Sequence, residues 1–161
     1  MEDFLLKLQE SDFGVWVSSA PTIFGPDVYP IFLMLHTVGL AMVVGPAWVL
    51  DLRLLGYGAR LPVETLRSAF RIMWIGFFIN ASTGIALFIS EADDKGLKWI
   101  FWVKLVSIAV ALVVTSRLRR AVFGGGVAAD VAPPRARSLA KASLALWLVA
   151  ITAGRLMAYI K

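Results

Sequence analysis

The sequence predicts an all-α fold, a four-transmembrane-helix bundle preceded by an N-terminal interfacial amphipathic helix. Of its 161 residues, 59% are hydrophobic, whereas a soluble domain of this length is usually nearer half apolar. The apolar residues are also gathered into four long runs, and a helix needs about 20 of them to cross a bilayer. We therefore predict one compact unit, with a surface segment at 1–27 and a transmembrane domain at 28–161.

The surface segment is expected to form a short amphipathic helix on the outer face of the membrane. Its first apolar residues share one helical face, namely Phe4, Leu5 and Leu8. Ser11 and Asp12 are residue types that cap a helix, so we expect a second short turn containing Phe13 and Trp16. The first residues, MEDFLLKLQE, are acidic where a signal peptide is basic, so we expect the N-terminus to be kept. A frayed tail is the alternative for this segment.

Four spans follow, at about residues 28–50, 68–90, 97–115 and 140–160. We expect Asp27 to cap the first span, and Pro30 is tolerated in its first turn. At the inner end of this span, Asp51 and Arg53 are expected to form a local ion pair that fixes the helix end. The loop at 116–139 contains GGGVAADVAPP and is expected to be a flexible cytoplasmic tether. No Gly-Lys-Ser/Thr follows these glycines, so the loop does not resemble a phosphate-binding loop.

Basic residues gather in two of the three connections between spans, and such loops face the cytoplasm in multi-pass membrane proteins. They are Arg53, Arg60, Arg67, Arg71, Arg117, Arg119, Arg120, Arg135, Arg137 and Lys141. The opposite side is mainly acidic, with Glu2, Asp3, Glu10, Asp12, Asp27, Glu91, Asp93 and Asp94. Both termini should therefore lie outside, in the periplasm of a bacterial inner membrane. The net charge of +5 is then a topology signal and an attraction to anionic lipid, and no nucleic-acid partner is expected.

Three ionisable side chains lie inside the spans, where a charge is costly and points to a function: His36, Lys104 and Arg155. His36 is the only histidine of the chain. At the rise of a helix, the three lie roughly 12, 9 and 8 Å from the outer boundary. Because alternate spans run in opposite directions, all three fall in the outer half, on three different helices. Asn80 on the second span is a further member of this set.

Small and polar residues form a stripe along each span, and such stripes mark helix–helix contacts in membranes. In the first span, His36 shares its face with Gly39 and Val43. The other stripes are Met73, Gly76, Asn80, Thr83 and Gly84 in the second span, Lys104, Ser107, Ala111 and Thr115 in the third, and Ser143, Ala150, Gly154 and Ala158 in the fourth. We expect these stripes to face the bundle interior or another subunit.

Simpler interpretations of the same polar residues stay open. Lys104 and Arg155 can extend to the outer interface without any function, where Tyr159 could hold Arg155 by a cation–π contact. His36 can satisfy its ring by a hydrogen bond to Asn80, to Thr83 or to a backbone carbonyl. In these interpretations the polar residues of the spans stabilise the fold and bind no ligand.

A b-type haem or a quinone would use residues of these types. A haem needs an imidazole ligand for its iron, a glycine that lets the flat ring approach, and cations for its propionates; the candidates are His36, Gly39, Lys104 and Arg155. Membrane b-type haems usually take two histidines, so a methionine (Met34, Met42 or Met157), an open position or a second copy of the chain would have to complete the coordination. A quinone needs only one imidazole or lysine and an apolar slot. One histidine is too few for a zinc or copper site.

The order of motifs resembles a known family. His36-x-x-Gly39 is followed by DLRLLG at 51–56, by Lys104 in the third span and by Gly154-Arg155 near the C-terminus. This pattern resembles small four-span bacterial inner-membrane proteins known only as a domain of unknown function, and more distantly the copper-resistance D-type and cytochrome b561-type membrane proteins. The resemblance implies the four-span topology. It implies no activity, because the additional histidines of the distant relatives are missing here.

Three classes of function remain open from the sequence. The first is a redox-linked subunit that binds a b-type haem or a quinone near His36. The second is a non-catalytic accessory or assembly subunit of a larger membrane complex, and the third is a small oligomeric transporter or channel for an anion or a metal. The expected partners are the lipid bilayer and either further copies of the chain or other subunits. The lack of cysteine excludes disulfides, thiolate metal sites and cysteine nucleophiles.

Overall fold

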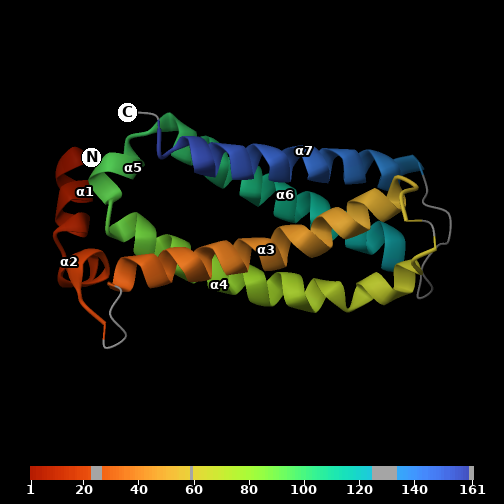
Figure 1. The fold of residues 1–161 in the computed structure, drawn as a ribbon. Coiled ribbons are helices and arrows are strands. Elements are labelled where there is room, and N and C mark those ends of the chain that lie inside the picture. Colours follow the sequence, from red (N-terminus) through yellow and green to blue (C-terminus); the bar gives the residue numbers. More distant parts are fainter. Residues whose placement is uncertain (23–26, 59, 125–133, 160–161) are drawn as a thin grey trace.

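A computed structural model describes residues 1–22, 27–58, 60–124 and 134–159, which are helical apart from short connections and one isolated β-bridge (Figure 1). The elements are α1 (Glu2–Gln9), α2 (Asp12–Ser19), α3 (Val28–Leu54), the 3₁₀ helix η1 (Val63–Arg67), α4 (Ala69–Ile89), α5 (Ala92–Gly96), α6 (Trp99–Phe123) and α7 (Pro134–Leu156). The predicted all-α fold is confirmed.

Four of these helices are long and apolar enough to cross a membrane, namely α3, α4 together with η1, α6 and α7. By the length and composition of its helices, the chain is a multi-pass membrane protein. The connection predicted at 116–139 is shorter than expected, because α6 continues to Phe123 and α7 already begins at Pro134. Leu118 and Val122 are buried, so this part of α6 keeps apolar contacts while its arginines stay exposed. The rest of the predicted tether, 125–133, lies outside the described residues.

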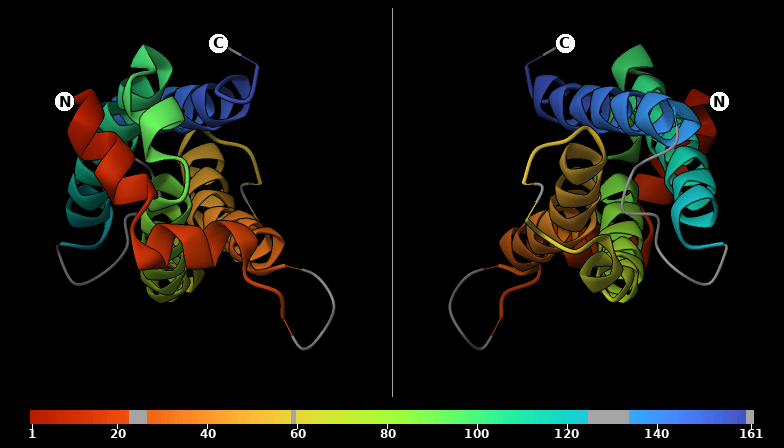
Figure 2. Two further views of the ribbon diagram at one scale, coloured as in Figure 1. Left: turned by 90° about the vertical axis from the view of Figure 1, so that its left-hand side faces the viewer. Right: turned by 90° about the vertical axis from the view of Figure 1, so that its right-hand side faces the viewer.

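Two antiparallel helix pairs, α3–α4 and α6–α7, make up the bundle, and they meet mainly where α3 packs on α7 (Figures 1 and 2). In contrast, the backbones of α4 and α6 stay farther apart, and side chains such as Phe88 and Phe101 meet across the seam between them. The N-terminus and the C-terminal end of α7 lie at one end of the bundle together with α1, α2 and α5 (Figure 1), and we call it the terminal end. The opposite end, where α3 connects to α4 and where α6 ends and α7 begins, is called the arginine-rich end.

The helices α3 and α4 cross in direct backbone contact at Gly39 and Gly76. A Cβ atom built on Gly39 would lie 2.7 Å from the backbone nitrogen of Asn80 and 2.9 Å from the carbonyl oxygen of Gly76. A Cβ atom on Gly76 would lie 2.9 Å from the carbonyl oxygen of Gly39. Only glycine fits on either side, so this crossing is a small-residue interface of the kind that membrane helices use.

The apolar core lies towards the arginine-rich end. Its buried members include Val43, Ala47, Leu50, Leu54, Val63, Leu66, Phe70, Met73, Ala111, Leu118, Val122, Ala140, Trp147 and Ala150. The predicted stripes face inward over most of their length: Gly39, Val43, Met73, Gly76, Thr83, Ser107, Ala111, Thr115, Ser143 and Ala150 are buried, whereas Ala158 is exposed. The packed core therefore lies mostly in one half of the bundle, and His36 and Lys104 lie in the other half.

Asp51 and Arg53 do not form the ion pair that we expected. Asp51 is 1% exposed and forms no ion pair within the described part of the chain, and its carboxylate lies beside the hydroxyl of Ser143 on α7. Arg53 instead donates from Nε to the carbonyl oxygen of Leu61 at 2.6 Å. The prediction was wrong because side chains two positions apart on a helix do not face each other.

The surface segment folds as two short helices, and the predicted cap between them is confirmed. The hydroxyl of Ser11 accepts from the backbone nitrogen of Gly14 at 3.2 Å and donates to the carbonyl oxygen of Leu8 at 2.6 Å. It therefore satisfies a free donor at the start of α2 and an acceptor at the end of α1. Asp27 occupies the N-cap position of α3, but its side chain makes no capping hydrogen bond.

The helix α1 rests on α5 and so covers the terminal end of the bundle (Figure 2). Leu5 packs against Gly96, where an added Cβ would lie 2.8 Å from Cδ1 of Leu5. The side-chain oxygen of Gln9 accepts from the backbone nitrogen of Asp93 at 3.1 Å. Several large apolar side chains of the segment remain exposed: Phe4, Phe13, Val15 and Trp16. An apolar face left open beside the bundle is what a helix at a membrane surface presents to lipid.

Candidate functional site

Two neighbouring cavities lie in the terminal half of the bundle. The first, which we call the polar cavity, has a volume of about 430 Å³ and is lined by residues from α3, α4, α5, α6 and α7. The second, the lateral cavity, has a volume of about 310 Å³ and follows the seam between α4 and α6. The residues that line both are His36, Gly84, Phe88, Phe101 and Lys104. Two of the three predicted ionisable residues therefore come together at the boundary between the cavities.

The ring of His36 is held by α4. Its Nδ1 lies 2.9 Å from the backbone oxygen of Asn80 and 3.2 Å from the hydroxyl of Thr83. A carbonyl oxygen can only accept a hydrogen bond, so Nδ1 carries a proton. Thr83 gives its own hydroxyl hydrogen to the carbonyl oxygen of Ile79 at 2.6 Å. Nε2 has no hydrogen-bond partner among the described residues, so in the neutral ring its lone pair is free for a ligand.

Two further α4 residues shape this contact. The side-chain amide of Asn80 donates to the carbonyl oxygen of His36 at 2.8 Å. Gly84 leaves room for the imidazole, because a Cβ atom there would lie 2.9 Å from Cε1 of His36. The simpler interpretation of His36, a ring satisfied by its neighbours, thus holds for one ring nitrogen only. A histidine oriented through one nitrogen and open at the other is typical of a ligand-binding residue.

Lys104 reaches from α6 across Gly154 of α7. A Cβ atom on Gly154 would lie 3.6 Å from Cδ and Cε of Lys104 and 3.8 Å from Nζ, so the lysine chain packs over the glycine. Lys104 is half-buried, and its ammonium group forms no hydrogen bond or ion pair with the described residues. An unpaired cation inside a membrane protein is costly, and an acceptor oxygen on a ligand would lower that cost.

Arg155 lies at the rim of the polar cavity and is exposed. Its guanidinium donates to the hydroxyl of Tyr159 at 2.9 Å and lies 5.4 Å from the centre of that ring. This is the contact that the simpler interpretation anticipates, in which the side chain extends towards the interface. Arg155 therefore shares the polar cavity with His36 and Lys104 but, unlike them, does not line the lateral cavity.

An ionic cluster borders the polar cavity at the terminal end, and the sequence analysis did not single it out. Lys95 pairs with Glu91, and Lys98 pairs with Asp94 at 2.8 Å. The hydroxyl of Tyr29 donates to Glu91 at 2.7 Å, and all five residues line the cavity. The spacing of acid and lysine four positions apart was a usable signal. The contact of Tyr29 was not, because its partner is 62 residues away in the sequence.

The glycine and methionine candidates for haem binding are mostly placed elsewhere. Gly39 does not line either cavity, because the backbone of α4 fills the space beside it. Met157 lines the polar cavity, whereas Met34 is exposed and Met42 packs against Gly76. The described residues contain no group of three or more histidine, cysteine or acidic side chains that could hold a metal ion. A haem would thus meet one imidazole and one thioether, without the flat approach that Gly39 was expected to give.

The lateral cavity is mainly apolar and opens towards the lipid. Phe88 of α4 and Phe101 of α6 stack at its boundary with the polar cavity, with ring centres 4.8 Å apart and planes at 10°. Beyond them the cavity is lined by Ile85, Trp102 and Leu105, which are exposed. Exposed apolar side chains on membrane-spanning helices face lipid, so an apolar ligand can reach this cavity from the bilayer.

A comparison of the chain with protein-family models, curated proteins and solved structures found no match. The resemblance to small four-span bacterial membrane proteins therefore stays a prediction. The function has to be inferred from the cavities themselves, which offer an acceptor at Nε2 of His36, a cation at Lys104 and an apolar path to the lipid.

Proposed function

We propose that the protein is a redox-linked membrane subunit that binds a quinone, with the ring between His36 and Lys104 and the tail in the lateral cavity. What supports this is that both residues line a polar cavity and also an apolar one that opens to lipid. A lipid-soluble quinone has the same two parts, a ring with two carbonyl oxygens and a long apolar tail. The proposal concerns binding and protonation of the quinone.

Each of the two polar residues has a separate role in this proposal. Lys104 donates a hydrogen bond to one carbonyl oxygen of the quinone, which gives its ammonium group the partner that it otherwise lacks. Nε2 of His36 accepts the hydroxyl hydrogen of the reduced form, because Nδ1 already donates its proton to Asn80. The tail lies among apolar side chains of the seam such as Ile85 and Leu105.

A b-type haem would use the same imidazole but fits this region less well. The chain has a single histidine, and α4 fills the space beside Gly39. The stacked pair of Phe88 and Phe101 stands at the boundary of the two cavities, where a rigid macrocycle would have to extend. A quinone ring requires no second ligand.

Quinone binding to the purified protein in nanodiscs tests the proposal. We expect saturable binding of a short-chain benzoquinone or naphthoquinone above the level of empty nanodiscs. Lys104→Met keeps the aliphatic chain and removes the ammonium group, so it should raise Kd about tenfold or more. His36→Asn keeps a donor near the position of Nδ1 and removes Nε2, and it should weaken binding of the reduced form in particular. Lys141→Met, an exposed lysine on α7, is the matched control and should leave Kd unchanged.

Two results would contradict the quinone proposal. One is the absence of saturable binding in nanodiscs, and the other is an unchanged Kd in both the Lys104 and the His36 variants. A Soret band in the purified protein that disappears in His36→Ala would assign the site to a haem instead.

A further inference from the structure

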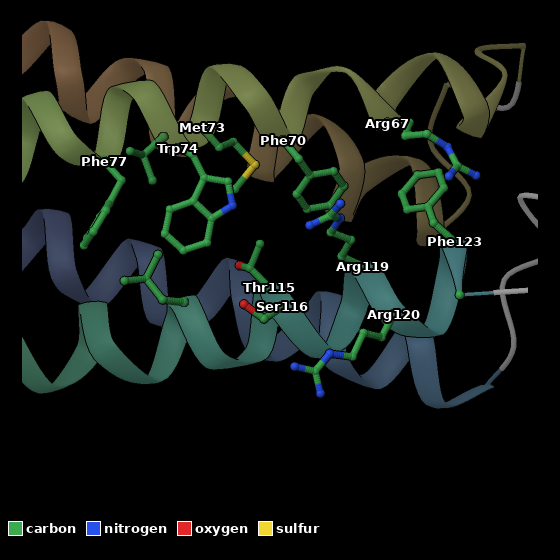
Figure 3. A pocket seen from close by; sticks show the side chains of 13 residues that line it. Arg67, Phe70, Met73, Trp74, Phe77, Thr115, Ser116, Arg119, Arg120 and Phe123 are labelled. Carbon is green, nitrogen blue, oxygen red and sulfur yellow. The ribbon is translucent and has the colours of Figure 1, made fainter. Parts of the chain in front are cut away.

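A third cavity lies in the seam between α4 and α6, towards the arginine-rich end, and the quinone proposal does not use it (Figure 3). We call it the arginine cavity, and its volume is about 350 Å³. Its lining includes Phe70, Trp74 and Phe77 from α4 and Thr115, Arg119 and Phe123 from α6. It is thus charged at one end and apolar at the other.

Three arginines line the cavity, Arg67, Arg119 and Arg120, and two of them lie over an aromatic ring. The guanidinium of Arg119 is 5.6 Å from the ring centre of Phe70, and that of Arg67 is 5.0 Å from the ring centre of Phe123. Figure 3 shows both arginines with these rings at the same end of the cavity. Arg67 also pairs with Glu64, whereas Arg119 forms no ion pair with the described residues. The charge of Arg119 is therefore available to an anion.

A buried hydroxyl one helical turn away is an independent sign of a ligand. Thr115 lines the cavity, is 6% exposed, and its Oγ1 has no hydrogen-bond partner among the described residues. A buried hydroxyl without a partner is costly. Thr115 and Arg119 are four residues apart on α6, so they share one face. A ligand with several acceptor oxygens would satisfy both groups at once.

The other end of the cavity lacks charge and faces the bilayer. Trp74 and Phe77 pack edge to face with ring centres 5.7 Å apart, and Trp74 is 44% exposed. Such a wall suits an acyl chain, whereas a small inorganic anion would make no use of it. This is the reason to assign the cavity to a lipid rather than to free phosphate.

We propose that the arginine cavity binds an anionic phospholipid from the leaflet at the arginine-rich end. The phosphate oxygens accept from the guanidinium of Arg119 and from the hydroxyl of Thr115, and an acyl chain lies along Trp74 and Phe77. The planar fork of an arginine matches phosphate oxygens, and basic pockets between membrane helices bind lipid headgroups in this way. The ligand would also fill space in the seam where the backbones of α4 and α6 lie farther apart than those of the other packed helices.

Native mass spectrometry of the full chain, delipidated in detergent, tests this proposal. The probes are dioctanoyl phosphatidylglycerol, phosphatidylcholine with the same chains, and inorganic phosphate. We expect phosphatidylglycerol to bind about tenfold more tightly than phosphatidylcholine, and inorganic phosphate to bind much more weakly than either. Arg119→Gln should weaken the binding of phosphatidylglycerol about tenfold. Arg117→Gln, on the same helix but outside the cavity lining, should leave it unchanged.

Thr115→Val separates a ligand contact from a structural role, because the two side chains have nearly the same shape. We expect it to weaken phosphatidylglycerol by about threefold, the loss of one neutral hydrogen bond. Without lipid, its melting temperature in detergent should be equal or higher, because an unpaired buried hydroxyl has been removed. A lower melting temperature with unchanged lipid affinity would overturn the contact proposed for Thr115.

Other outcomes would overturn the proposal as a whole. If Arg119→Gln and Arg117→Gln lose the same affinity for phosphatidylglycerol, the lipid is attracted to the basic surface in general. If inorganic phosphate binds as tightly as the lipid, free phosphate is the ligand. None of these outcomes bears on quinone binding at His36, which is a separate measurement.

Discussion

At the scale of the residue, the surroundings decide what a small or polar side chain does. Gly39 and Gly154 both belong to small-residue stripes, yet Gly39 admits the backbone of α4 and Gly154 admits the chain of Lys104. His36 and Asp51 are both polar residues of α3. His36 hydrogen-bonds α4, whereas the buried carboxylate of Asp51 lies beside the hydroxyl of Ser143 on α7. Residue type and spacing in the sequence drew attention to all four residues. Their different roles follow only from the residues that surround them in the fold.

The crossing of α3 and α4 gives a prediction at this scale. Gly39→Ala should destabilise the protein by about 1–3 kcal/mol, the usual cost of overpacking, because the new Cβ meets backbone atoms of Asn80 and Gly76 that cannot move independently. Ala41→Ser on the same helix is the control, since Ala41 is exposed. It should cost no more than about 0.5 kcal/mol. Denaturation in detergent micelles measures both, and equal effects would contradict the close crossing.

At the scale of the element, α6 serves two sites with one face. Lys104 near its start borders the polar and lateral cavities, and Thr115 and Arg119 near its end border the arginine cavity. These residues follow the three- and four-residue spacing that keeps side chains on one side of a helix. Because α4 stands back from this face, the seam between the two helices opens at both sites.

The short helices at the terminal end give a prediction about capping. Ser11→Ala removes the hydrogen bond to Gly14 and the one to Leu8, which should cost about 1 kcal/mol locally. Amide hydrogen exchange in α2 should then be about fivefold faster, with the exchange of α4 unchanged. Ser18→Ala is the control, because Ser18 is exposed and bonds only the carbonyl oxygen of Val15 within its own helix. Equal acceleration in both variants would show that the cap does not hold α2.

At the scale of the whole molecule, the two ends of the bundle differ in packing and in the charged groups that they hold. The apolar core lies towards the arginine-rich end, while His36, Lys104 and the ionic cluster lie towards the terminal end. The two antiparallel helix pairs are joined along α3 and α7 and open along α4 and α6. All three cavities use residues of that open side. The seam is therefore the feature of the fold that positions both proposed sites.

The direction of the bundle in the membrane can be tested without a background of native thiols, since the chain has no cysteine. Ser18→Cys places a thiol at the terminal end and Ser68→Cys at the arginine-rich end, and both serines are exposed. In spheroplasts of an expressing bacterium, a membrane-impermeant maleimide should label only Ser18→Cys, because loops rich in arginine stay in the cytoplasm. After permeabilisation both should be labelled. Labelling of Ser68→Cys alone in intact spheroplasts would show that the bundle has the opposite orientation.

The sequence by itself determined the four spans, the pattern of arginines that predicts their direction, and the shared depth of His36 and Lys104. These properties depend on the length of each apolar run, on the charges beside it and on the rise of a helix, and all three can be read from neighbouring residues in the sequence. Only the tertiary structure decided which residues meet: Gly39 contacts α4 rather than a ligand, Asp51 lies in the interior, and Arg155 turns to Tyr159. It also revealed the arginine cavity. The reason is that helix pairing depends on contacts between distant segments, such as His36 with Asn80, and no local pattern records which spans are neighbours.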